Sequence, residues 1–386
     1  MADIDFSAVT GPTSWTDTLF KHAIGEGWTD MKVRLHRDDE IVQTGQGESK
    51  AELVIHARIN RTMQEVASLS GKNAESVVNR IKSVAGIKTG PAIAPVDGLY
   101  PYREVEDETV LNAVDIRVAV FPTHVGETIT LRFPTAAVAV SIHDLGLSEH
   151  NFMLLQRILG IANGLVLLAG PMGAGKSTTM RAVLAEFGGT DKSVWTVEDP
   201  VELTIEGVEQ IGINADAGNG WPDVLRGLRR SDLEVLMIGE IRDYEQASAA
   251  LEIGNAGAKV LSSIHANDNV GAVQQLMELS GKPPRTLGNQ LRGVVSQRLI
   301  RTFHTDCGGS GCEGCAGSGY KGVAPVHEIL IIDDDFINAL AAGATTGELR
   351  ATAIERGMRT LRMTAQELID GARTDEKEVQ RVLGND

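Results

Sequence analysis

The sequence predicts an α/β protein with a small α/β domain at the N-terminus, a larger three-layer domain built on a parallel sheet, and a helical C-terminal extension. Two observations carry this prediction. Short apolar runs alternate with helical stretches between residues 148 and 264, a pattern typical of parallel strands buried on both faces. After residue 345 the spacing of apolar residues becomes helical. A chain of 386 residues has room for two or three domains.

The first domain is expected to span residues 16–134 and to be a small PAS-like α/β domain. Two strands, at 115–121 and 127–133, are expected to pair around a turn rich in proline and glycine. A polar connector over residues 135–147 then separates this domain from the next. The earlier part of the domain shows strand alternation at 31–35 and helical spacing at 19–24, 57–69 and 76–84.

The second domain is expected to span residues 148–386. Ser148 is of the residue type that caps helices, and it precedes a predicted helix over 149–161. Thr345 and Glu348 form a capping box for a helix that runs to Arg356. Thr374 is expected to cap a last helix that ends at Gly384. Buried strands are predicted at 165–169, 194–197, 235–238 and 259–264.

One segment of this domain predicts a nucleotide site. Residues 170–177 fit the pattern G-x-x-x-x-G-K-[ST], and they lie between a predicted strand and a predicted helix. In this pattern backbone N–H groups surround a polyphosphate at a helix N-terminus, the lysine reaches the β- and γ-phosphates, and the hydroxyl ligates Mg²⁺. The alternative is a glycine-rich turn without a ligand. The residues expected to bind ATP or GTP are Gly170, Pro171, Met172, Gly173, Ala174, Gly175, Lys176, Ser177 and Thr178.

Three polar segments follow predicted strands. Glu198 begins one acidic cluster, Glu240 lies in a second, and His265 follows a third strand. Because the carboxyl ends of parallel strands meet at one edge of a sheet, all three are expected near the phosphate loop. A nucleotide hydrolase needs one carboxylate for the waters of its metal and another to orient the attacking water. Each residue also has a structural alternative: a helix cap for the acids, and a satisfied core side chain for the histidine.

The order of four segments, at 170–177, 197–202, 237–243 and 263–266, resembles the secretion ATPase superfamily that drives type II secretion and type IV pili. In that family they are the Walker A, Asp box, Walker B and His box motifs. The resemblance implies a RecA-like P-loop NTPase fold, ATP as substrate and Mg²⁺ as metal.

The resemblance also implies roles for individual residues. Glu198 is the expected catalytic base, and His265 the expected sensor of the γ-phosphate. Glu240, through water, and Ser177 are the expected holders of Mg²⁺. The sequence leaves open which of the two glutamates is the base.

The resemblance extends to both ends of the chain. In the first domain, Arg117 and Arg132 match arginines that the family uses against the γ-phosphate. An arginine brought to that charge is worth ~10³–10⁵ in rate; the alternative is two solvated arginines on a strand face. Residues 319–330 and 355–361 resemble extension-type assembly ATPases rather than retraction motors. Positions that depart from the family's usual residues are Lys32, Leu99 and Ala266.

All three cysteines of the chain lie close together in the C-terminal part. Extension-type members often bind zinc with two Cys-x-x-Cys pairs; here the second pair is intact and the first begins with a histidine. A tetrahedral zinc site takes four nitrogen or sulfur donors. The candidate donors for a structural Zn²⁺ are His304, Cys307, Cys312 and Cys315, in a loop over 304–315 whose short gap needs Gly308, Gly309 and Gly311 to fold. The alternative is a flexible loop with reduced thiols.

The composition and net charge of the chain limit the classes of partner and the location that can be expected. The net charge of −16 disfavours a long nucleic-acid track, which needs clustered Lys and Arg, and leaves proteins as the expected partners. No apolar run approaches the ~20 residues of a membrane span, and the acidic first residues are unlike a signal peptide. A cytoplasmic location is therefore expected.

By resemblance, the chain is expected to form a homo-oligomeric ring, a hexamer, at the cytoplasmic face of an inner-membrane platform. There it would power pilus assembly, protein secretion or a related conjugative or type IVB apparatus. Two other functions stay open. One is a RecA-like motor that translocates nucleic acid, and the other is a nucleotide-gated scaffold without turnover.

Overall fold

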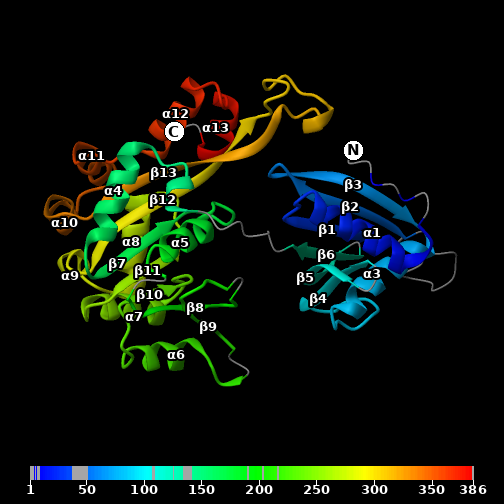
Figure 1. Ribbon diagram of the computed structural model, residues 1–386, viewed down its shortest axis with the longest axis horizontal. Helices are drawn as coiled ribbons and strands as arrows, with labels where there is room; N and C mark the ends of the chain where they lie inside the picture. The colour runs from blue at the N-terminus through cyan, green and yellow to red at the C-terminus, as the bar shows by residue number, and fades with distance from the viewer. Residues whose placement is uncertain are drawn as a thin grey trace. The chain divides into compact units, whose positions relative to one another are not determined.

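The computed structural model describes residues 4, 6, 9–36, 51–106, 109–124, 126–133, 141–188, 191–201, 204–214 and 217–384, with the backbone alone at 105, 106 and 109–113. Most of the acidic start of the chain, residues 135–140 of the predicted linker, and Glu202 lie outside the described residues. The chain forms two compact units (Figure 1): one comprises residues 1–136 and 310–318, the other 137–309 and 319–386. The domain boundaries drawn from the sequence stay a prediction.

The first unit contains a six-stranded sheet in the order β3-β2-β1-β6-β5-β4, and every neighbouring pair is antiparallel. The expected pairing of two strands around a turn is confirmed, because β5 and β6 pair with Val120 opposite Ile129. The elements are α1 (Gly11–Gly25), β1 (Asp30–His36), β2 (Glu52–Ile59), β3 (Thr62–Ser70), α3 (Lys72–Val84), β4 (Val96–Glu106), β5 (Thr109–Thr123) and β6 (Gly126–Arg132).

One face of this sheet carries the core of the unit. Strand β1 buries every second residue, Met31, Val33 and Leu35, as its alternation predicts. These side chains pack with Phe20 of α1 and Ile81 of α3 in one apolar cluster. Residues at the intervening positions of the strands are half-buried or exposed. The two helices therefore cover a single face, and the other face presents polar side chains.

The helix predicted over 57–69 is wrong, because this segment forms the hairpin of β2 and β3. The turn between the strands is made by Asn60 and Arg61, with φ of 46° and 65°. Two successive left-handed residues are typical of a two-residue hairpin turn and incompatible with a continuous helix. On β3 only Val66 is fully buried, so the strand lacks the regular alternation that would have distinguished it from a helix.

The second unit confirms the predicted α/β fold. Its seven-stranded sheet has the order β13-β12-β7-β11-β10-β8-β9; the pairs from β12 to β9 are parallel, and β13 is antiparallel to β12. The strands are β7 (Gly164–Ala169), β8 (Val194–Glu198), β9 (Glu209–Gly212), β10 (Val235–Ile238), β11 (Lys259–Ile264), β12 (Leu291–Phe303) and β13 (Tyr320–Ile331).

Helices cover both faces of this sheet, which makes three layers. On β7, Leu165 and Leu167 pack into an apolar cluster with α6, α7, α8 and the first two helices that follow β13. Val166 and Leu168 point into a second cluster with α4 and α5. The helices of this unit before β12 are η1 (Ile142–Asp144), α4 (Glu149–Gly160), α5 (Lys176–Ala185), α6 (Trp221–Leu228), α7 (Tyr244–Asn255), α8 (Asn269–Ser280) and α9 (Pro284–Gly288); η3 (Glu313–Cys315) lies in the segment 310–318 of the first unit.

The C-terminal extension is helical, as expected, and consists of α10 (Asp334–Ala341), α11 (Thr346–Glu355), α12 (Leu361–Asp370) and α13 (Glu376–Leu383). Two of the predicted caps are confirmed: Ser148 caps α4, and Thr345 forms a capping box with Glu348 at α11. The predicted cap of the last helix is wrong. Asp375 caps α13, whereas the Thr374 hydroxyl donates to the carbonyl of Arg301 at 2.8 Å.

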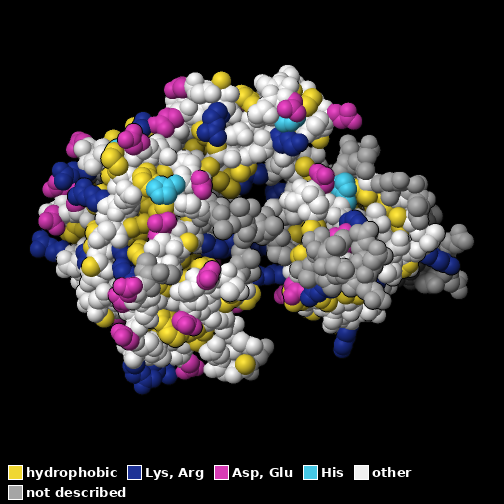
Figure 2. Space-filling model, in the orientation of Figure 1, with side chains coloured by type: hydrophobic (Ala, Val, Ile, Leu, Met, Phe, Trp, Pro, Cys, Tyr) yellow, Lys and Arg dark blue, Asp and Glu magenta, His cyan; other side chains and the backbone are white. Residues whose placement is uncertain are grey.

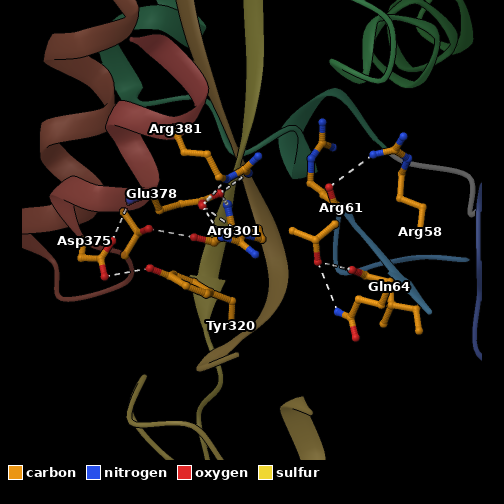
Figure 3. A network of polar contacts seen from close by, with 11 residues as sticks. Arg58, Arg61, Gln64, Arg301, Tyr320, Asp375, Glu378 and Arg381 are labelled. Carbon is orange, nitrogen blue, oxygen red and sulfur yellow. Dashed lines mark hydrogen bonds and ion pairs between the residues drawn. The ribbon is translucent and has the colours of Figure 1, made fainter. Parts of the chain in front are cut away.

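A buried ion pair attaches the last helix to the sheet (Figure 3). Arg301 of β12 donates from Nε and Nη2 to Glu378 Oε2 of α13, at 2.9 and 2.6 Å. Arg381 donates to both oxygens of the same carboxylate, at 2.7 and 2.6 Å. The Tyr320 hydroxyl donates to Asp375 Oδ2 at 2.7 Å. Helix α13 is therefore held by bidentate charge-assisted hydrogen bonds rather than by apolar packing alone.

Candidate active site

The phosphate loop connects β7 to α5 and depends on glycine. Gly170, Gly173 and Gly175 have φ of 153°, 71° and 91°, which side chains rarely tolerate. A Cβ at Gly175 would lie 2.6 Å from Gln297 Nε2, and one at Gly170 would lie 2.8 Å from the Gln297 carbonyl oxygen. Helix α5 begins at Lys176, and no side chain among the described residues caps it. The first N–H groups of the helix are therefore directed at the space over the loop, where they suit an anion.

Lys176 folds back over this loop. Its side chain is almost fully buried, and Nζ donates to the carbonyl oxygens of Gly170 at 2.6 Å and Pro171 at 3.2 Å. Burial lowers the pKa of Lys176 to about 8; the charge of Glu240 opposes this shift, and that of Arg298 adds to it. A desolvated ammonium held on neutral carbonyls gains electrostatic energy when phosphate oxygens replace them. The loop thus fits a polyphosphate.

Glu240 and His265 meet beside the lysine. They follow the adjacent parallel strands β10 and β11. His265 Nε2 lies 2.8 Å from Glu240 Oε1, and its Nδ1 lies 3.1 Å from the Gly170 carbonyl oxygen and 3.4 Å from Lys176 Nζ. Arg242 Nε donates to Glu240 Oε2 at 2.9 Å. The expected convergence of strand-end residues on the phosphate loop holds for these two.

Glu198 ends strand β8, next to β10 in the sheet. Its Oε1 accepts from Thr196 Oγ1 at 2.8 Å and from Gln210 Nε2 at 3.0 Å. The carboxylate therefore lies at the same edge of the sheet as Glu240, oriented by donors from β8 and β9.

A hollow of about 610 Å³ opens beside the phosphate loop. Pro171 and Met172 form one wall, and residues 265–268 form another. Met172 is 73% exposed. The remaining lining residues are Gly271, Gln275 and Thr346.

Arg117 and Arg132 are direct neighbours across strands β5 and β6 of the first unit. Both side chains are exposed. Arg132 Nε lies 3.4 Å from Asp30 Oδ1, and Arg58 Nε lies 3.2 Å from Oδ2 of the same carboxylate. The two arginines thus share one face of the sheet, and their role at a phosphate stays a prediction.

The cysteine loop between β12 and β13 brings its four candidate ligands together. The donor atoms of His304, Cys307, Cys312 and Cys315 all lie within 4.8 Å of one another. The two sulfurs of the Cys-x-x-Cys pair are 3.8 Å apart, and Cys307 Sγ is 3.8 Å from His304 Nδ1. A tetrahedron with Zn–S bonds of ~2.3 Å has edges of about 3.8 Å. The donor set therefore fits a zinc ion.

The glycines that this loop was expected to need have left-handed conformations. Gly308, Gly309 and Gly311 have φ of 56°, 88° and 90°. A Cβ at Gly309 would lie 2.6 Å from the Phe303 ring, and one at Gly311 would lie 2.7 Å from the Gly317 carbonyl oxygen. The short gap between the two ligand pairs closes only because these positions carry no side chain.

A family model described as "Type II/IV secretion system protein" matches residues 41–381 of the chain. The chain belongs to this family. The predicted membership of the secretion ATPase superfamily is confirmed, and the family implies ATP and Mg²⁺ as the ligands of the phosphate loop.

Two curated relatives place the chain within the family. The type IV pilus assembly ATPase PilB of Thermus thermophilus is 32% identical over 336 residues, which cover 80% of this chain and 37% of PilB. The type II secretion system protein HxcR of Pseudomonas aeruginosa is 33% identical over 338 residues, which cover 85% of this chain and 71% of HxcR. The chain thus spans little more than a third of the first relative's length.

Two solved structures share the fold of this chain. The ATPase DotB of Legionella pneumophila matches with a TM-score of 0.68 at 19% identity, covering 96% of this chain and 95% of DotB. The pilus retraction motor PilT, solved with bound ADP, matches with a TM-score of 0.56 at 20% identity, covering 95% and 98% of the two chains. Within the described part of this family member, no helix is long and apolar enough to cross a membrane.

Residues outside the four motifs also support the family's phosphate loop. The Thr179 hydroxyl of α5 donates to Gln297 Oε1 at 2.7 Å, and both side chains are buried. Sequence reasoning missed Gln297, although three successive polar residues at 296–298, flanked by apolar pairs on both sides, were a usable signal.

Proposed function

We propose that this chain is the Mg²⁺-dependent ATPase motor of a pilus-assembly or protein-secretion machine, or of a related conjugative or type IVB apparatus. The observation that carries the proposal is the meeting of Lys176, Glu240 and His265 at the carboxyl edge of the parallel sheet, within hydrogen-bond distance of one another or of Gly170. Membership of a family whose relatives include PilB supports it.

The phosphate-binding role falls to Lys176 and the first turn of α5. Lys176 exchanges the carbonyl oxygens of Gly170 and Pro171 for phosphate oxygens, at little cost in hydrogen bonds. Ser177, exposed on the first turn of α5, and Glu240, through water, hold Mg²⁺, which neutralises phosphate charge.

The two glutamates divide the remaining work. Both oxygens of Glu240 have partners, His265 and Arg242, which suits a carboxylate that holds metal-bound water and not one that takes a proton. Glu198 is then the catalytic base, and the donors on its Oε1 fix its orientation. His265, between Gly170 and Glu240, is placed to respond when the γ-phosphate leaves.

The remaining parts of the motor follow from the family. Arg117 and Arg132 reach the γ-phosphate from the first unit, and the chain works as a homo-oligomeric ring, a hexamer. It acts on the cytoplasmic side of an inner-membrane platform, with proteins as partners. Figure 2 shows acidic and basic side chains interspersed over the visible face of the second unit, which supports protein partners over a nucleic-acid track.

We also propose a structural Zn²⁺ in the cysteine loop. His304, Cys307, Cys312 and Cys315 hold it, and no step of ATP hydrolysis passes through it. The ion fixes the loop between β12 and β13.

Steady-state ATPase assays on the wild type and Glu198→Gln test the function. The amide keeps the size of the carboxylate but cannot take a proton, so we expect kcat to fall ~10²–10⁴-fold with ATP binding preserved. Glu209→Gln, an exposed carboxylate on the neighbouring strand β9, is the matched control and should behave as wild type.

Three outcomes would contradict the proposal. Tight ATP binding without turnover in the wild type would indicate a nucleotide-gated scaffold. Turnover stimulated by DNA, with salt-dependent DNA affinity, would indicate a nucleic-acid motor. Weakened binding with a normal kcat in Glu198→Gln would exclude Glu198 as the base.

A further inference from the structure

Arg298 of β12 lies buried between two loops of the active site and belongs to none of the four motifs. Its side chain is 8% exposed. Nη2 donates to the Asn267 carbonyl oxygen at 2.7 Å, and Nη1 donates to its neighbour Gln297's carbonyl oxygen at 2.9 Å. Asn267 is two residues beyond His265. The guanidinium therefore fixes the backbone of the loop that carries the proposed sensor.

The same guanidinium packs against the phosphate loop. A Cβ at Gly170 would lie 3.3 Å from Arg298 Nη1, so the loop backbone passes directly over the arginine. Gln297, the preceding residue, is bonded to Thr179 behind the loop. Residues 297 and 298 of one rigid strand thus contact both the phosphate loop and the loop at 265–268.

Two nearby carboxylates balance the buried charge of Arg298. These carboxylates belong to Glu328 and Asp268, and their charges favour the charged form of Arg298. Glu328 is also buried and accepts from the backbone N–H of Asn269, at 3.1 Å, and of Leu361, at 3.3 Å. Burial raises the pKa of Glu328, an effect that these two hydrogen bonds oppose. The carboxyl group of Glu328 thus joins the N-termini of α8 and α12.

We propose that Arg298 is a positioning residue for hydrolysis, which holds the loop at 265–268 against the phosphate loop and so keeps His265 in contact with both Gly170 and Glu240. The inference rests on the proposed function. Its role differs from that of an arginine finger, because Nη1 and Nη2 each donate to a backbone carbonyl group and the side chain acts on phosphate only through His265. A carbonyl-bonded arginine serves geometry, which lysine can only partly replace because it lacks the planar fork.

The test is a double-mutant cycle with four chains: wild type, Arg298→Met, His265→Ala and the double variant. A small misplacement of a catalytic group costs up to ~10²-fold, so we expect Arg298→Met to lower kcat ~10–100-fold. The dissociation constant of a fluorescent ATP analogue should change by less than about 3-fold. In the His265→Ala background the same substitution should cost less than about 2-fold, because the group that it positions is gone.

Two further variants keep the test decisive. Arg298→Lys retains the buried charge and should fold even where Arg298→Met does not; we expect an intermediate kcat and a normal affinity. Arg292→Met is the matched control. Arg292 lies on the same strand and donates to the Asn163 carbonyl oxygen at 2.9 Å, near the opposite edge of the sheet, so its kcat should equal that of the wild type.

Equal losses of kcat in both backgrounds would overturn the proposal, because Arg298 would then act independently of His265. A large loss of analogue affinity in Arg298→Lys would overturn it too, by placing the arginine on the nucleotide itself. Absence of turnover in the wild type would be a failure of the proposed function, which the wild-type assay alone reveals.

Discussion

Two lysines of the second unit have almost the same local chemistry but lie at opposite ends of the parallel strands. Lys176 follows the carboxyl end of β7, and Lys259 is the first residue of β11. Lys176 and Lys259 are both buried, and each donates from Nζ to two backbone carbonyl oxygens. Burial lowers the pKa of each to about 8. A desolvated lysine on carbonyl oxygens is therefore not in itself a functional site.

The neighbours of the two lysines distinguish them. Lys259 begins β11, and its acceptors are the carbonyl groups of Leu159 and Ile161 at the end of α4. A cation at a helix C-terminus is a structural cap, and among the described residues it is the charge of Lys192 that adds to the burial effect on the pKa of Lys259. Lys176 instead has Glu240 and His265 beside it. Glu240 and His265 follow the carboxyl ends of the parallel strands. We call this side of the sheet the equipped edge, because acidic side chains and a histidine gather there beside the phosphate loop.

Substituting the two lysines is the strongest test of this comparison. Lys176→Ala should abolish ATP turnover and leave the thermal unfolding temperature close to that of the wild type, since one of its two acceptors lies on the exposed Pro171 and the other, the Gly170 carbonyl oxygen, keeps His265 as a partner. Lys259→Ala should do the reverse, lowering the unfolding temperature while folded protein keeps its kcat. ATPase assays and calorimetry on both variants check this. Unchanged turnover in folded Lys176→Ala would remove the nucleotide assignment.

The second prediction tests whether the residues at the equipped edge suffice for ATP hydrolysis, or whether arginines of the first unit are also needed. If Arg117 and Arg132 meet the γ-phosphate, replacing either by alanine should lower kcat ~10³–10⁵-fold, although both lie in the first unit. Arg58→Ala is the matched control, because Arg58 pairs with Asp30 as Arg132 does. A chain that begins at Ser148 should bind nucleotide and hydrolyse little.

Rings assembled from two different variants test whether Arg117 acts within its own chain or between subunits. Combining Arg117→Ala chains with Lys176→Ala chains should restore part of the activity if the arginine acts between subunits, because some interfaces then contain one intact lysine and one intact arginine. No recovery in verified mixed rings would place Arg117 within its own chain's site or give it a structural role only.

The site could be predicted from the sequence where backbone geometry dictates residue type. Gly170 and Gly175 are required by their positive φ and by close neighbours, so the phosphate loop leaves a local signature. Buried parallel strands predict where polar residues emerge, which located Glu240 and His265. Arg298 and Gln297 could not be assigned in this way, because their partners are more than a hundred residues away or are backbone groups.

The errors in the fold have the same origin. The segment 57–69 was misassigned because edge strand β3 buries too little to show a period of two. The cap at Thr374 was displaced by one residue because Asp375 is equally suitable, and only the tertiary contact of Thr374 with Arg301 decides between them.

The third prediction concerns the cysteine loop, which lies away from the equipped edge in sequence and should affect stability, not chemistry. Elemental analysis should give one zinc per chain. Structural zinc contributes ~10–16 kcal/mol of apparent binding energy in small zinc-dependent domains, so Cys312→Ser or chelation should lower the unfolding temperature. Glu313→Gln, at an exposed position of the same loop, should not. Metal-free protein with unchanged stability would reject the zinc site.

The smallest expected effect concerns the hydrogen bonds of Glu378 with Arg301 and Arg381, which we call the α13 clamp. Like Lys259, this clamp is structural. Burial alone would raise the pKa of Glu378, but hydrogen bonds from Arg381 and Arg301 outweigh it and lower the pKa to about 2. Breaking a buried ion pair costs about 3–5 kcal/mol, so Glu378→Gln should lower the unfolding temperature of the second unit. Glu376→Gln removes the exposed pair with Arg362 on the same helix, and such pairs are worth ~0–1 kcal/mol.

The contribution of the clamp to the free energy of unfolding should depend on pH. Because the folded-state pKa of Glu378 lies below its ordinary value of 4.5, its contribution to stability is fully present above pH 4.5 and is lost as the pH falls toward 2. The stability gap between the wild type and Glu378→Gln, measured by urea unfolding, should thus be constant from pH 7 to pH 5 and shrink below about pH 4.5. A gap that persists unchanged at pH 3.5 would mean that packing of the side chain, not its ionised form, holds the helix. The kcat of Glu378→Gln and of Glu376→Gln at pH 7 should match the wild type, because the hydrogen-bond partners of both glutamates lie on β12, α12 and α13 and not at the phosphate loop.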